Sequence, residues 1–272
     1  MNLKVKVLVA FVIIVIVSCA TNPFTGKSTL AFVPNNKLIP MSLQQYDQFL
    51  KENKVIEGTK QAQSVQNVGV RIKQAAEKWL NANGYSQYLK DYRWEYKLVD
   101  DPAVNAWCMP GGKICFYSGI MPVCKDDAGV ATVMGHEVAH ALANHGQQRM
   151  SGGILQQVGA AAVSVSTQNA SEKKQQQWMT AYGAGSQVFG MLPFSRSHES
   201  EADKIGLTLM AMAGYNPEHA IAFWQRMASA TGNENKPPEF MSTHPSHNTR
   251  INNIKTLIPQ AKAEAAKYGV KF

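Results

Sequence analysis

Two histidines stand four residues apart in the stretch VMGHEVAHAL, with a glutamate directly after the first. Each residue of a helix advances by about 100°, so His136 and His140 lie about 40° apart and their imidazoles can converge on one ion. Neutral imidazoles bind Zn²⁺ and leave its charge available to acidify a water molecule. Glu137 projects from the neighbouring face and can take the proton from that water. The spacing therefore predicts one zinc ion per chain, with Glu137 as a general base.

The neighbours of this motif favour a metal site over an ordinary surface helix. The pattern H-E-x-x-H is typical of zinc peptidases, but a five-residue pattern also arises by chance. Two histidines and a glutamate are costly in an apolar helix unless they have a partner. The residues around the motif are indeed apolar, namely Val133, Val138, Ala139, Ala141 and Leu142.

A third ligand must come from elsewhere in the chain. His145 follows His136 by nine residues, which puts it about 180° around the helix, and we expect it to be a helix C-terminal residue favoured by the dipole. The metzincin extension of the motif needs glycine at 143 and histidine at 146, where this chain has Ala143 and Gly146. That class is excluded.

The stretch FSRSHESEADKIG offers carboxylates at helical spacing. Glu199 and Asp203 are four apart and share a helix face, so Glu199 can bind zinc while Asp203 accepts an N–H from a ligating histidine. Glu201 points away from both. His198 is the rival ligand, and a charged, solvated helix face is the alternative for the whole stretch.

The first residues resemble a lipoprotein signal. A short basic start is followed by VLVAFVIIVIVS, which is too short for a comfortable membrane span. The residues before Cys19 resemble a lipobox, so we expect a signal peptide over 1–18, lipidation of Cys19 and a tether over 19–40. A plain signal peptide or an uncleaved anchor is the alternative. Ala20 is not the aspartate of an inner-membrane retention signal, which favours the periplasmic side of the outer membrane.

The periodicity of the rest predicts an α+β fold that is predominantly helical with a small antiparallel sheet. The hydrophobic residues make up 45% and the charged residues 17% of the 272 residues, which is typical of a globular protein, and we expect one domain over 41–272. The net charge of +8 comes without a dense Lys/Arg run, so no nucleic-acid partner is expected. Helices are expected over 41–54, 60–83, 126–146, 197–213, 217–228 and 249–268. Residues 151–166 are either a packed helix or a membrane-surface element.

The stretch CMPGGKIC predicts a hairpin. If Gly111 and Gly112 are its two loop residues, Cys108 and Cys115 lie opposite each other and could pair. A Cys115–Cys124 pair and buried thiols are the alternatives.

Three blocks carry a family resemblance: HEVAHALANH, then LPFSRSHESEADKIGLTLM, then STHPSHNTRI. In this order, over roughly residues 60 to 260, they resemble the CaaX prenyl endopeptidase and Oma-type zinc metallopeptidases, the minigluzincins, and above all their soluble bacterial branch of periplasmic lipoproteins. The resemblance implies a zincin-like domain in which Glu199 is the third ligand and Asp203 its partner. It implies that His244 lies near the zinc, either assisting the oxyanion or capping the metal, and that Arg250 belongs to the same block.

The resemblance also implies a substrate site. The stretch NAWCMPGGKICFYSGI is similar to the family's edge strand, with Asn105 and Ala106 matching, and such an edge would bind an extended polypeptide by strand addition. The implied role is the cleavage of misfolded or unassembled envelope proteins. A non-catalytic chaperone-like factor and a self-inhibited form capped by His244 are the alternatives. From the loop THPSHNTR alone, incidental surface histidines would be expected, and His247 and His219 keep that interpretation. The oligomeric state stays open.

Overall fold

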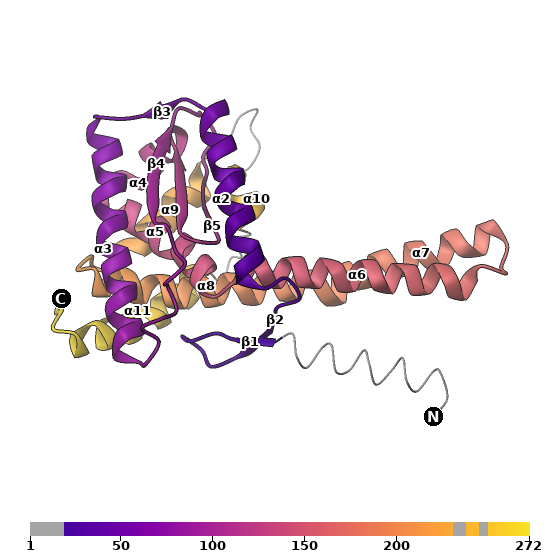
Figure 1. Cartoon of the computed structure of the whole chain (residues 1–272). Coiled ribbons are helices and arrows are strands. Elements are labelled where there is room, and N and C mark those ends of the chain that lie inside the picture. The colour runs from indigo at the N-terminus through magenta and orange to yellow at the C-terminus, as the bar shows by residue number, and fades with distance from the viewer. Residues whose placement is uncertain (1–18, 231–237, 245–249) are drawn as a thin grey trace. The chain divides into compact units, whose positions relative to one another are not determined.

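The computed structural model describes residues 19–230, 238–244 and 250–272 (Figure 1). The expected signal peptide lies outside the described residues. The chain forms two compact units. The hairpin unit consists of the residues up to Leu38 and of Asn144–His198, and the core unit consists of Ile39–Ala143 and Glu199–Phe272. No pattern in the sequence sets residues 144–198 apart, and one peptidase domain over 41–272 stays a prediction.

The core unit contains a four-stranded mixed sheet. Its strands are β3 (Val55–Ile56), β4 (Glu95–Val99), β6 (Lys113–Tyr117) and β5 (Ala106–Met109), in that spatial order. β3 pairs antiparallel with β4, and β5 pairs antiparallel with β6, but β4 and β6 are parallel. The expectation of an antiparallel sheet is therefore wrong for this central pair. After β4 the chain forms β5 at the edge of the sheet, one strand position away from β4. The hairpin then brings β6 into the position between β4 and β5.

The β5–β6 hairpin has a three-residue loop. Met109 pairs with Lys113, so Pro110, Gly111 and Gly112 form the loop, and both glycines take positive φ values of 92° and 84°. Positive φ favours glycine because it lacks a Cβ. Cys108 consequently pairs with Ile114, and Cys115 pairs with Trp107. The expected opposition of the two cysteines is wrong, since one extra loop residue moves every later side chain to the other face. Cys108, Cys115 and Cys124 are free thiols.

Helices surround this sheet in the core unit. The predicted helix over 60–83 is confirmed as α3 (Lys60–Ala82), in which Thr59 Oγ1 accepts the Ala62 N–H at 3.1 Å. Its buried stripe includes Val65, Val68 and Ile72, and α3 packs alongside β4 and α5 (Figure 1). The other helical segments are α2 (Asn35–Glu52), η1 (Ser118–Ile120), α4 (Met121–Cys124), α5 (Asp127–Leu142), α8 (Leu192–Met212), α9 (His219–Ser229), α10 (Glu239–Thr243) and α11 (Arg250–Lys267), of which α2 and α8 begin in the hairpin unit.

The helix α5 carries the H-E-x-x-H motif and is buried on all sides. Asp126 caps it, with Oδ1 accepting the Gly129 N–H at 2.9 Å. Every residue from Gly129 to Leu142 is buried. The expected end at Gly146 is wrong: Asn144 takes the left-handed conformation with φ 56°, and a new helix starts at His145. His145 is thus the first residue of a helix rather than the last.

The helices α5 and α8 touch through their backbones. A Cβ on Gly135 would lie 2.6 Å from the Gly206 carbonyl oxygen, and a Cβ on Gly206 would lie 2.8 Å from the Gly135 carbonyl carbon. No side chain fits in either place without separating the helices. This close approach brings the residue after Gly135, His136, next to the α8 turn that carries Asp203.

The hairpin unit holds two strands and two long helices. β1 (Cys19–Thr21) and β2 (Ser28–Leu30) form an antiparallel pair in the segment where an extended tether was expected. α6 (His145–Thr167) and α7 (Glu172–Ser186) lie side by side (Figure 1), and the π-helical turn η2 (Gln187–Met191) follows. Tyr182 Oη donates to the Gln156 carbonyl at 3.0 Å across this pair. In the described part of the chain, no helix is both long enough and apolar enough to cross a membrane.

Candidate metal centre

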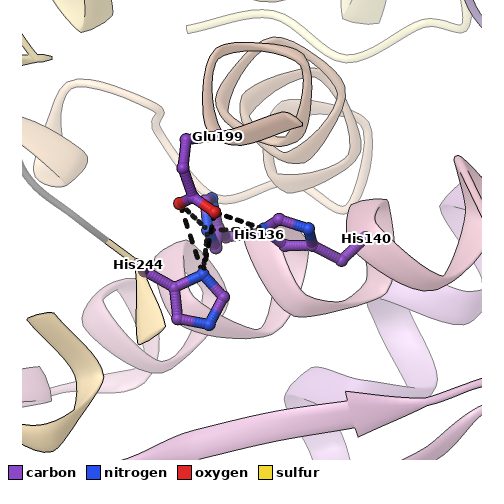
Figure 2. Close-up of side chains that lie close together, drawn as sticks. All are labelled: His136, His140, Glu199 and His244. Atoms are coloured by element: carbon purple, nitrogen blue, oxygen red, sulfur yellow. Dashed lines mark hydrogen bonds and ion pairs between the residues drawn. The ribbon is translucent and has the colours of Figure 1, made fainter. Parts of the chain in front are cut away.

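Four side chains of ligand type converge in the core unit (Figure 2). α5 supplies His136 and His140, α8 supplies Glu199, and His244 directly follows α10. His136 Nε2 lies 3.1 Å from His140 Nε2, 3.2 Å from Glu199 Oε2 and 3.2 Å from His244 Nδ1. All four residues are at least 94% buried. The structure thus brings together the three predicted ligands and His244.

These separations fit a metal ion. A tetrahedral ion with ligands about 2.0–2.1 Å away holds neighbouring ligand atoms roughly 3.3 Å apart. The observed separations are 3.1–3.4 Å, and His140 Nε2 lies 3.4 Å from Glu199 Oε1. Lone pairs packed this closely in a buried place need a cation or a proton between them. The donor set therefore suits a metal cofactor of the kind that two imidazoles and a carboxylate hold.

Asp203 and Arg250 orient this donor set. Asp203 Oδ1 accepts from His136 Nδ1 at 3.0 Å, which leaves the Nε2 lone pair of His136 facing the other ligands. Arg250 Nη2 donates to the same Asp203 oxygen at 2.6 Å, and Arg250 Nη1 reaches Glu199 Oε2 at 3.5 Å. Both residues are buried. Their roles as supporting residues of a metal site stay a prediction.

The charges of the site set its protonation in the absence of an ion. Burial lowers the pKa of His136, but hydrogen bonds to Asp203 and Glu199 outweigh it and raise that pKa to about 9. Burial alone would raise the pKa of Glu199, but hydrogen bonds from His136 and His244 hold it well below its usual range. Asp203 is kept ionised in the same way, because Arg250 and His136 lower its pKa against burial. The carboxylates are thus ready to bind a cation.

An aromatic wall next to the site was not predicted from the sequence. The Phe240 ring stacks on His244 with centroids 4.6 Å apart, and the Arg250 guanidinium lies 3.6 Å from the centroid of the Trp224 ring. Phe240 precedes His244 by four residues, a spacing that could have indicated a shared helix face. No comparable signal marks Trp224, because its position depends on how α9 packs.

A protein-family model and several curated proteins match this chain over most of its length. The model described as "Peptidase family M48" matches residues 69–258, which is well over half of the chain. The chain belongs to peptidase family M48. The predicted family and enzyme class are therefore confirmed: the chain is a metallopeptidase of this family.

Individual M48 relatives come from mitochondria and from bacteria. Mitochondrial metalloendopeptidase OMA1 of Schizosaccharomyces pombe is 36% identical over 180 residues, which are 65% of this chain and 50% of that protein. The Saccharomyces cerevisiae protein of the same name is 34% identical over 204 residues, 72% of this chain and 56% of the relative. The beta-barrel assembly-enhancing protease of Yersinia pestis is 28% identical over 173 residues, 61% of this chain and 35% of the relative. The chain spans about half the length of the first two relatives.

The residue that the H-E-x-x-H spacing predicts as general base lies beside the donor set. Glu137 is 2% exposed, and its Oε1 lies 3.4 Å from His244 Nε2. The strand β5 lies close to it: burial raises the pKa of the Cys108 thiol well above its usual range, and the Glu137 carboxylate adds to that shift. β5 therefore packs close to the candidate base.

The predicted substrate-binding residues lie at the start of β5. This strand is at the edge of the sheet. Asn105 is buried; its Nδ2 donates to Glu239 Oε1 at 3.0 Å, and its Oδ1 accepts the Ala106 N–H at 2.9 Å. The Phe240 N–H donates to the Val104 carbonyl at 3.0 Å. The segment α10, which ends at His244, is thus attached to the chain just before the edge strand.

Two histidines near the motifs belong to the hairpin unit. His145 and His198 stack with centroids 4.1 Å apart, and His198 Nε2 lies 3.0 Å from Gln148 Oε1. Neither belongs to the group of ligand-type side chains found among the described residues. Among the described residues, the group of ligand-type side chains thus contains Glu199 and not His198. His219 starts α9, and His247 lies outside the described residues.

Proposed function

We propose that this chain is a zinc-dependent endopeptidase in which His136, His140 and Glu199 hold the metal. The observation that carries the proposal is the cluster of four buried donors, each 3.1–3.4 Å from at least two of the others, in a chain of peptidase family M48. Two imidazoles and one carboxylate, with a fourth position for water, are a usual donor set of catalytic zinc.

Zinc, when bound, supplies Lewis acidity that lowers the pKa of a water molecule and polarises a carbonyl group. The residues of the chain do the rest. Glu137 accepts a proton from the attacking water and returns it to the leaving amine. Asp203 holds His136 in the tautomer that presents Nε2, and Arg250 keeps Asp203 and Glu199 in place.

His244 has two candidate roles. Its Nδ1 lies 3.2 Å from both His136 Nε2 and Glu199 Oε2, within the donor set, which supports a self-inhibited form in which His244 occupies the fourth position. Its Nε2 lies 3.4 Å from Glu137, which would also let it donate to a developing oxyanion after a small movement. The first role fits the observed distances better.

The substrate we propose is an extended, misfolded or unassembled polypeptide of the bacterial envelope. β5 is an edge strand beside Glu137, and an edge strand offers unpaired backbone groups to a second chain, with Asn105 and Ala106 at its start. The name of the Yersinia pestis relative supports an envelope role. Lipidation of Cys19 would fix the protein to the outer membrane on its periplasmic side.

Casein cleavage with a matched variant tests the proposal. The full chain in detergent and its Glu137→Gln variant are incubated with unfolded casein, and bound zinc is assayed in both. We expect one zinc in each and cleavage only by the native chain. Absence of metal from both would refute the ligand assignment, and equal cleavage by both would refute the role of Glu137.

The alternative function is a chaperone-like envelope factor that keeps the metal for structure. An intact Glu137 beside the donor cluster argues against it, because a binding protein has no use for a buried base. Should the native chain hold zinc without cleaving casein, His244→Ala separates the cases. Increased cleavage would support the self-inhibited form, and continued inactivity would favour the chaperone-like factor.

A further inference from the structure

The helix α6 exposes a stripe of apolar side chains. Met150, Ile154, Val158 and Val165 are 40, 38, 51 and 65% exposed. Their spacing of four, four and seven residues puts them within an arc of about 80° around the helix. Gln156 and Gly159, which contact Tyr182 of α7, lie on the opposite side of α6. The stripe is thus the face of α6 that points away from α7.

The charged and polar residues of the helix pair α6–α7 are distributed unequally between the two helices. α6 has 23 residues and a single charged one, Arg149, whereas a solvent-exposed helix usually carries charges on its outer face. The outer face of α7 is polar, with Lys173, Gln176 and Gln177 exposed. In the pair α6–α7 (Figure 1), the outer side of α6 is therefore apolar and the outer side of α7 is polar, while Trp178 and Met179 of α7 are also exposed, at 60 and 37%.

The segment that follows β2 is hydrogen-bonded to the first two turns of α6. The Phe32 N–H donates to Ser151 Oγ at 3.0 Å, and Gln147 Nε2 donates to the Val33 carbonyl at 2.8 Å. Cys19 is the first residue of β1, so these contacts lie only a few residues beyond the β1–β2 pair that contains it. The apolar run VLVAFVIIVIVS immediately precedes Cys19. The point at which the chain would meet a membrane thus belongs to the same compact unit as the α6 stripe.

We propose that the α6 stripe lies in the lipid–water interface of the membrane to which Cys19 attaches the chain. This inference rests on the membrane attachment proposed above. A helix with an apolar face and a polar outer side lies in the plane of the interface, with that face among the acyl chains. The charge of α6 agrees: its one charged residue, Arg149, is exposed and directly precedes Met150 at the start of the stripe, where a positive charge suits anionic headgroups.

Quenching by brominated lipid measures this contact directly. The full chain with Val158→Cys is labelled with bimane and reconstituted in phosphatidylethanolamine–phosphatidylglycerol vesicles, with or without bromine on the acyl chains. The matched control is Gln177→Cys on the outer face of α7. Cys115 and Cys124 are fully buried, and the chain without an added cysteine gives the background from the remaining native thiol. We expect severalfold stronger quenching at position 158 than at position 177.

Three results would decide the inference. Weak quenching at both positions in chains that float with the vesicles would overturn it and leave the attachment at Cys19 standing. Chains that do not float would overturn both proposals. A bimane signal at position 158 that instead depends on protein concentration would identify the stripe as an interface between two copies, and the inference would be wrong.

A pair of charge substitutions tests the role of the stripe itself. With bimane at Val165→Cys, the double change Ile154→Glu and Val158→Glu should lower the lipid contact of α6 by roughly tenfold or more, because two apolar side chains leave the interface. The matched control, Gln176→Glu with Gln177→Glu, adds the same charge on the polar side and should leave the quenching intact. Unchanged quenching in the first variant would contradict the proposal. Far-UV circular dichroism verifies that both variants keep their helices.

Discussion

The consecutive helices α5 and α6 differ in which side chains they bury and which they expose. In α5 every residue from Gly129 to Leu142 is buried, and the polar side chains are the ones that need an explanation. In α6 large apolar side chains are exposed, and burial is confined to its first residues. A buried polar group raises the free energy of the folded protein unless it has a hydrogen-bonding or ionic partner. A large exposed apolar patch marks a surface that binds another molecule or a membrane. We infer a metal ion as the partner of α5 and a lipid surface as the partner of α6.

The largest effect should come from the packing of α5. Leu142 is fully buried, and Leu142→Ala should lower the free energy of unfolding by about 2–5 kcal/mol, because it removes apolar contacts and leaves a cavity. Urea denaturation followed by circular dichroism measures this change. A loss of less than about 1 kcal/mol would contradict the close packing of α5.

A smaller effect should come from the residue that orients His136. Asp203→Asn keeps an acceptor oxygen but removes the charge, and it should weaken zinc binding by about 10- to 100-fold. Competition with a chromogenic chelator gives the affinity. Lys204→Gln, the next residue on α8, is exposed and serves as the control. Equal affinities of the two variants would refute the role of Asp203.

Zinc binding should also depend on pH. The pKa of His136 without an ion is about 9, so this imidazole is protonated at neutral pH and must lose its proton before it binds metal. Zinc affinity should therefore rise as the pH rises towards 9 and then level off, because His136 is already neutral there. Calorimetry near neutral pH in buffers of different ionisation enthalpy should detect the released proton. Binding without proton release would be inconsistent with the hydrogen bonds of His136.

The smallest effect is expected on α6. Ile154→Ala should change the free energy of unfolding in detergent by less than about 0.5 kcal/mol, since the side chain is exposed. The same urea titration used for Leu142→Ala provides the measurement. A loss comparable with that of Leu142→Ala would mean that Ile154 packs within the protein, and the contrast between the two helices would disappear.

The sequence predicted which side chains converge in the core unit because the spacing of each pair is set within a single helix. His136 and His140 on α5, and Glu199 and Asp203 on α8, are related by the helical repeat, which is independent of tertiary structure. The contacts made by Trp224 and Glu239 depend on how separate segments pack. No local pattern indicates them.

The errors in the fold have specific causes. The hairpin register was wrong because Pro110 joins Gly111 and Gly112 in the loop. The break between α5 and α6 was missed because Asn144 adopts the left-handed conformation there, whereas the sequence analysis relied on glycine as the stop signal. The parallel β4–β6 pair was missed because the order of strands in a sheet is decided by long-range packing.

Because Gly135 and Gly206 set the distance between α5 and α8, metal binding depends on two residues that have no side chains. Alanine at either position would separate α5 from α8 and pull the histidines of one helix away from the carboxylates of the other. In a genetic screen for inactive protease, such alleles would group with the loss of a ligand. A geneticist who mapped them would place two glycines in the active site, although neither can touch the substrate or the ion.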